Sequence, residues 1–193
     1  HSERTGDGNN HNINFFSDLY EIKTSLNHNS IIDTNSEGLI GFHFQNYDQG
    51  ALGQEESHLV HTRTSSFALF ALESFNFDLF DLDVGGRLES VNLRNTSMEK
   101  GFFPGAFSST IKREIFTNNT FYGGFDFTER APNAVELFAN GPHHALEQFE
   151  VGDSNMDVET SYNFSLGYSY NNGLDSLKIE TYYNYIDDFI AAD

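Results

Sequence analysis

The residues best suited to bind a metal ion gather in one polar stretch, residues 128–153, which reads TERAPNAVELFANGPHHALEQFEVGD. The candidates there are His143, His144, Glu147, Glu150 and Asp153. A second polar stretch near residues 49–61 adds Glu55, Glu56, His58 and His61. Imidazole and carboxylate groups together suit Zn²⁺ or a similar divalent ion. The spacing matches no fixed zinc motif such as HExxH, so a solvated acidic loop remains the alternative.

The first of these stretches is expected to be a long loop. Pro132 and Pro142 lack an N–H and are predicted to break any strand ladder. Asn140, Gly141 and Pro142 form a turn signal. Arg130, Pro132 and Glu136 are expected to shape the base of the loop. Long polar loops often carry function.

The segments around this loop alternate between apolar and polar residues, which predicts β-strands. The clearest is residues 78–91, where Phe80, Leu82, Val84 and Leu88 share one face. The other face carries Asp81, Asp83, Arg87 and Glu89. Four charged residues on one face need water or partners, so this face is expected to line a water-filled interior. Seven further segments read as strands: 13–27, 37–48, 62–76, 102–114 (interrupted by Pro104), 121–130, 156–171 and 177–185.

The links between these strands alternate in length. Short turns are predicted near Phe77, Asn118 and Asn172, and longer links near Ala51, Asn95 and Gly141. Outer-membrane barrels place short turns on the periplasmic side and long loops outside the cell. Residues 49–61, 93–101 and 131–156 are therefore expected to be extracellular.

Composition excludes several classes of protein. The chain has 193 residues, enough for one domain, and a net charge of −19 from 29 acids and 10 bases. Nucleic-acid binding needs clusters of Lys and Arg, so we expect none. There is no cysteine and no apolar run long enough for a membrane helix. The sequence also has no G-x-S-x-G, P-loop or G-x-G-x-x-G signature, so no enzyme activity is expected. The acidity fits either simple solubility or a surface that attracts cations.

Several segments resemble one family. The run ERAPNAVELFANGPH, followed by FEVGD and MDVETSYNFSLGY, is similar to TonB-dependent outer-membrane receptors, and most like their zinc-uptake subgroup. LIGFHFQNYDQGALGQEE, LDVGGRLESV and YNYIDDFI are weaker matches in the same order, so the resemblance covers residues 37–190. His143 matches the histidine of the family's GPH run, whereas His144 is an additional residue.

This resemblance implies an all-β fold, an antiparallel up-and-down transmembrane β-barrel of about 22 strands, of which about eight are present here. Nothing in the chain resembles the family's plug, its TonB-contacting peptide or its terminal aromatic strand. Residues 1–193 are therefore interpreted as a partial TonB-dependent receptor β-barrel domain. The span between residues 91 and 128 looks shorter than the two strands usual for the family, so its pairing is left open.

The resemblance also implies function. We expect a receptor in the outer membrane of a Gram-negative bacterium that takes up a scarce nutrient, most simply zinc or a metal chelate. Its partners would be TonB (through the plug), outer-membrane lipid, and the extracellular metal or chelate. No tightly bound cofactor is expected, with Zn²⁺ only as a transported substrate. A siderophore or haem receptor is the alternative within the family, and a secreted acidic β-sandwich module or adhesin is the alternative outside it.

Overall fold

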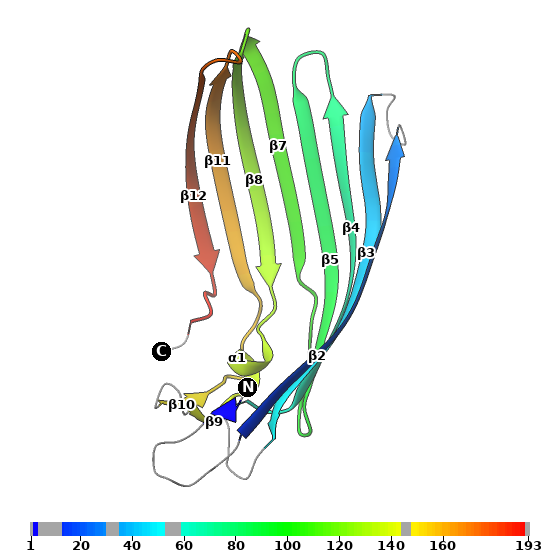
Figure 1. Cartoon of the computed structure of the whole chain (residues 1–193), viewed down its shortest axis with the longest axis vertical. Coiled ribbons are helices and arrows are strands. Elements are labelled where there is room, and N and C mark those ends of the chain that lie inside the picture. Colours follow the sequence, from blue (N-terminus) through cyan, green and yellow to red (C-terminus); the bar gives the residue numbers. More distant parts are fainter. Residues whose placement is uncertain (1, 4–12, 30–34, 53–58, 144–147, 192–193) are drawn as a thin grey trace.

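The computed structural model contains an open, curved antiparallel sheet (Figure 1), and it describes residues 2–3, 13–29, 35–52, 59–143 and 148–191. Eight long strands each pair with the next in chain order. They are β2 (Ile13–Asn29), β3 (Ser36–Leu52), β4 (Thr62–Asn76), β5 (Asp81–Arg94), β7 (Gly105–Phe116), β8 (Asn119–Arg130), β11 (Glu159–Asn171) and β12 (Ser176–Asp187). The two-residue β1 (Ser2–Glu3) pairs beside β2, and the described sheet does not close on itself. This confirms the predicted all-β, antiparallel, up-and-down barrel wall.

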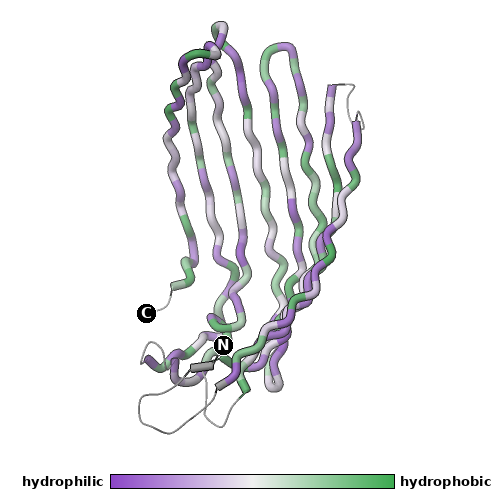
Figure 2. Tube along the Cα trace, viewed as in Figure 1, coloured by the Kyte–Doolittle hydropathy of each residue, from purple (hydrophilic) through white to green (hydrophobic). Residues whose placement is uncertain are grey.

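The register sorts the two faces of the sheet by polarity. One row across four strands joins Lys23, His43, Ala68 and Glu89, whereas the next row joins Ile22, Phe44 and Phe67. Hydrophilic and hydrophobic residues accordingly alternate along the strands in Figure 2. Successive side chains of a strand point to opposite faces, so a fixed register keeps each set on its own side.

The polar face is the concave one. A groove of about 710 Å³ is lined by side chains of this face from Lys23 on β2 across to Asn163 on β11. A groove that reaches so many strands can only lie inside the curve of the sheet. The residues predicted to face a water-filled interior, Asp81, Asp83, Arg87 and Glu89, all lie on this concave face by register. There Asp83 binds Lys112 at 2.6 Å and accepts a hydrogen bond from Ser74 at 2.7 Å.

The convex face is apolar and carries a band of aromatic rings. Phe125 contacts Phe164, with ring centroids 5.0 Å apart, and Phe127 contacts Tyr162 at 5.5 Å. Tyr162 in turn lies 6.3 Å from Tyr185. Tyrosines near strand ends are typical of membrane–water interfaces, because the ring is apolar and the hydroxyl is polar. No helix among the described residues is long and apolar enough to span a membrane.

The links follow the predicted alternation, with short turns at one end of the sheet (Figure 1). The turns at 77–80, 117–118 and 172–175 are tight, and two of them need a left-handed residue: Asn118 at φ 66° and Gly173 at φ 88°. Residues 30–34 and 53–58, which belong to two predicted links, lie outside the described residues. β3 continues to Leu52, so the first part of the predicted loop 49–61 is strand.

The loop predicted at 93–101 is also largely strand, which is a correction. β5 runs on to Arg94, and β6 (Glu99–Phe102) folds back beside it. The Asn95 side chain accepts hydrogen bonds from the backbone N–H groups of Ser97 and Met98, and this makes the turn tight. After Pro104, β7 takes over the pairing with β5, so the span 91–128 holds two full strands after all.

On the concave wall a tyrosine ring lies over a glycine. A Cβ added at Gly167 would collide with the ring of Tyr122, whose hydroxyl donates a 2.9 Å hydrogen bond to Glu180. We expect Gly167→Val to displace the ring and destabilise the barrel by about 1–3 kcal/mol, as overpacking does. The measurement is the folded fraction of the full-length receptor, from its heat-modifiable gel mobility. Gly101→Ala is the control, because a Cβ there meets nothing within 4 Å. Equal folded fractions for the two variants would contradict this role of Gly167.

Candidate functional site at the rim of the sheet

The stretch between β8 and β11 is folded, not an extended loop. It contains the short helix α1 (Ala134–Phe138) and the strands β9 (Asn140–His143) and β10 (Gln148–Val151). Asn133 caps the helix: its Oδ1 accepts from the N–H groups of Val135 and Glu136 at 2.9 and 3.0 Å. The Glu136 carboxylate accepts from the Asn133 N–H at 2.7 Å, completing a capping box. The expectation of a loop throughout 131–156 is therefore wrong.

The prediction that Pro142 breaks any ladder is also wrong. Pro142 lies inside β9, opposite Phe149 of β10. In a sheet of two strands each strand has an unpaired side, so a proline whose nitrogen faces that side removes no ladder hydrogen bond. Gly141 is buried opposite Glu150, so the predicted turn at 140–142 is a strand.

The helix packs against the concave face at the end of the sheet opposite the tight turns (Figure 1). Leu137 and Phe138 are 1% and 4% exposed, and they form one cluster with Leu93 of β5 and Phe102 of β6. The β5–β6 hairpin is thus the platform that holds α1. The spacing of Ala134, Leu137 and Phe138 matches a helix face and could have indicated this helix from the sequence.

Arg130 fastens this folded segment to the rim. Its Nη1 donates to both oxygens of Glu136 at 3.1 and 3.0 Å, and its Nε and Nη2 donate to Glu159 at 3.4 and 3.3 Å. Arg130 and Glu136, two of the residues expected to shape the base of the loop, are thus in direct contact. Glu159 also accepts from the Ile190 N–H at 2.9 Å. The Arg130 guanidinium, and after it this N–H, lower the pKa of the Glu159 carboxyl, which lies at the rim beyond the aromatic band.

Under the helix the inner wall is hollowed into what we call the mouth pocket, of about 740 Å³. One side is the segment from Thr128 to Val135, including Pro132, and the other is the concave face of β3, β4 and β5. The polar side chains of the wall are Gln45, Tyr47, Gln49, Thr64, Ser66 and Glu89, and Val91, Leu93 and Pro104 add apolar surface beside them. The sequence did not indicate any of these polar side chains except Glu89, because they belong to three separate strands.

A ladder of charged and polar groups continues from the mouth pocket along the wall. Arg87 donates to Glu89 at 2.9 Å and to Nδ1 of His43 at 3.3 Å. Because arginine only donates, this Nδ1 must be the acceptor nitrogen. His43 therefore carries its proton on Nε2 and donates it to Glu21 at 2.7 Å. Arg87 and Glu89 thus form an ion pair, and Glu21 is hydrogen-bonded to His43.

Those predicted metal ligands that the structure describes are not brought together. His144, Glu147, Glu55, Glu56 and His58 lie outside the described residues. His143 pairs with Gln148 and Glu150 with Gly141 in the β9–β10 ladder, and Asp153 accepts from the N–H of Asn155 at 2.8 Å. His61 binds Asp48 at 2.6 Å. Within residues 13–29, 35–52, 59–143 and 148–191, no three His, Asp or Glu side chains are placed to share a metal ion.

The polar inner wall, apolar outer wall and folded rim define the class, an outer-membrane β-barrel receptor. A family model described as TonB dependent receptor-like, beta-barrel, matches residues 2–193, so the chain belongs to the TonB-dependent receptors. Members of this family are transporters in the outer membrane of Gram-negative bacteria, which gives the location of this chain and TonB as its partner. The end of the sheet that carries α1 is accordingly the extracellular mouth.

Removing the Arg130 contacts should release the folded segment from the rim. In Arg130→Met, Glu136 and Glu159 lose charged hydrogen bonds, although the arginine side chain is 41% exposed and solvent weakens each bond. We expect proteinase K to cleave residues 131–158 roughly tenfold faster, while the barrel stays folded. The matched control is Arg113→Met, an exposed arginine of β7 near a tight turn. Equal cleavage rates for both variants would show that Arg130 does not hold the segment.

Proposed function

We propose that this receptor captures a metal chelate in the mouth pocket and delivers it inward for TonB-driven import. The single observation that supports a chelate best is the chemistry of the pocket wall. Amide and hydroxyl groups both donate and accept hydrogen bonds, so they suit a ligand rich in oxygen atoms. Tyr47 adds an aromatic face, and the pocket volume falls in the usual range for small-molecule sites.

The charges around the pocket support the same proposal. Arg130 is occupied by Glu136 and Glu159, and Arg87 by Glu89. A ligand in the pocket would therefore meet mainly neutral groups, an arginine that already binds two acids, and carboxylates that already accept hydrogen bonds. Such a wall favours a chelate whose charge is largely enclosed, and it disfavours a bare divalent ion, which needs three or four direct protein ligands.

Free zinc is the second candidate, and one observation favours it. His143 lies in the β9–β10 hairpin at the mouth, in the same stretch of sequence as the candidates His144, Glu147, Glu150 and Asp153. Under this proposal His143 is the first ligand, and His144, Glu150 and Asp153, with Glu55 and His58 from the β3–β4 link, would complete the site.

The transport step would use parts beyond this wall. As the family membership suggests, a plug would close the barrel, and TonB would pull on it after the chelate binds. The ladder from Glu89 through Arg87 and His43 to Glu21 would face this plug. Its paired charges would offer a polar surface along which a plug could slide without exposing an isolated buried charge.

The chelate proposal predicts a specific loss of affinity. We expect Tyr47→Ala in the full-length receptor to weaken binding of a chelate about tenfold, because one aromatic contact is lost. The measurement is calorimetric titration with three probes, a ferric hydroxamate, a ferric catecholate and haem. Tyr183→Ala, on the apolar convex face, is the matched control and should bind as wild type. Equal affinity in both variants, or no binding of any probe by wild type, would contradict the proposal.

The zinc proposal makes a separate prediction. If zinc is the substrate, His143→Ala should lower Zn²⁺ affinity at least tenfold in the same titration, because one of about four ligands is lost. His28→Gln is the control, since His28 pairs with Glu73 far from the mouth and glutamine keeps a hydrogen-bonding group there. Unchanged zinc binding in His143→Ala would remove this residue from the site.

A further inference from the structure

The convex face carries a row of charged residues just beyond its apolar band. The row runs across five strands in register and consists of Asp18, Asp48, Arg63, Arg94 and Glu99. The apolar band begins four residues further along β4, at Phe67, and contains Leu69 on the same face. The row lies at the extracellular end, so it sits where the headgroups of the outer leaflet meet the barrel.

Two arginines face each other in this row. Arg63 and Arg94 are direct cross-strand partners, and like charges in that position repel unless an anion lies between them. Between and around them is a pocket of about 450 Å³, which His61, Ser65, Asn92, Asn95, Thr96 and Glu99 also line. Most of these side chains supply neutral hydrogen-bonding groups beside the two guanidinium groups, and Glu99 adds one carboxylate.

The nearby acids do not neutralise both arginines. Asp48 holds Arg63 at 2.9 Å and His61 at 2.6 Å, and Glu99 accepts a hydrogen bond from Asn92 at 2.9 Å. The Arg94 guanidinium forms no hydrogen bond or ion pair within the part of the chain that the structure describes. Arginine matches the geometry of a phosphate with two donors at once, so a phosphate between Arg63 and Arg94 would relieve their repulsion.

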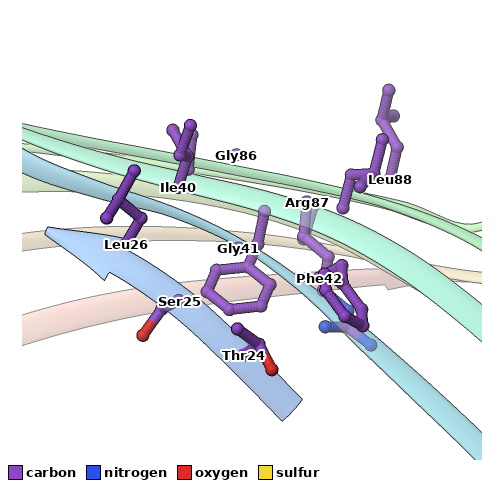
Figure 3. A pocket seen from close by; sticks show the side chains of 13 residues that line it. Thr24, Ser25, Leu26, Ile40, Gly41, Phe42, Gly86, Arg87 and Leu88 are labelled. Atoms are coloured by element: carbon purple, nitrogen blue, oxygen red, sulfur yellow. The ribbon is translucent and has the colours of Figure 1, made fainter. Parts of the chain in front are cut away.

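Further along the same two strands, the apolar face is hollowed (Figure 3). Gly86 of β5 lines this depression of about 670 Å³, and an added Cβ there would meet nothing within 4 Å. Leu26, Ile40 and Leu88 form its apolar rim. It lies inside the hydrocarbon band, so its natural occupant is an acyl chain.

The distance between the two features fits one lipid molecule. From Gly86 to Arg94 the strand advances about 27 Å at about 3.4 Å per residue. Tilted by about 40°, this corresponds to about 20 Å along the membrane normal, close to one leaflet with its headgroup. We propose that β4 and β5 bind a phosphorylated lipid of the outer leaflet, with its phosphate between Arg63 and Arg94 and a chain in the Gly86 depression.

The test uses the full-length receptor in detergent and phosphatidic acid as the probe, with retained lipid measured by native mass spectrometry. Each arginine near a charged membrane surface is worth about 1 kcal/mol, so Arg63→Gln/Arg94→Gln should weaken binding roughly 25-fold. Arg113→Gln, an outward arginine near a tight turn, is the matched control and should bind as wild type. Equal affinity in the double variant and the control would overturn the proposal.

Two further arms separate a lipid from a free anion. Gly86→Leu fills the depression and should reduce retention of phosphatidic acid several-fold while both arginines remain. Phosphatidylcholine with the same chains, and inorganic phosphate at the same concentration, should compete poorly. Competition by inorganic phosphate as strong as by phosphatidic acid would overturn the lipid assignment, and so would unchanged retention in Gly86→Leu.

Discussion

The structure depends on one constraint, which is that a chain crossing a bilayer must satisfy every backbone N–H and C=O group internally. Here eight long strands pair in chain order, and within the described residues only the two at the edges of the open sheet lack a second long partner strand. Once the register is set, side chains divide between two solvents. Ile22, Phe44 and Phe67 meet lipid, while Lys23, His43 and Glu89 meet the interior. The separation of the faces is therefore a consequence of pairing and period, and the chemistry of each face follows from it.

The inner face needs further arrangement because charges on a confined wall require partners. The wall provides them locally, as Arg87 joins Glu89 and His43, and Lys112 joins Asp83. Two cations of the inner face, Arg87 and Lys112, are in this way paired with acids. An aromatic ring on the inner face also depends on a neighbour in the adjacent strand. Tyr122 lies over Gly167, where the missing side chain leaves room for a ring flat against the wall.

The elements at the rim form the mouth pocket together with this wall. The β5–β6 hairpin extends the wall beyond the aromatic band and offers Leu93 and Phe102 as an apolar platform. Helix α1 packs on that platform, and Arg130 ties it to two strands at once. The mouth pocket exists because the helix lies over the inner face and leaves space beneath it. A folded rim of this kind presents the pocket residues in fixed positions, which lowers the entropy lost on binding.

By itself the sequence determined the strands and their faces. Alternation is a local property, so the segments 62–76 and 121–130 and the polar face of Asp81, Asp83, Arg87 and Glu89 were all predictable from a period of two. The tight turns at Asn118 and Gly173 were equally readable, because few residues accept positive φ. The pairing of Arg130 with Glu136 was within reach because both belong to one short segment.

Only the tertiary structure decided the rest. Pro142 joins a strand because its partner strand leaves one side free, and the hairpin of residues 93–102 places Leu93 and Phe102 against α1. The mouth pocket assembles Gln45, Thr64 and Glu89 from three strands, and the cross-strand pair Arg63 and Arg94 meets only through the register of β4 and β5. Such neighbours are far apart in the chain, so no local pattern records them, and their proximity follows from which strands pair and in which register.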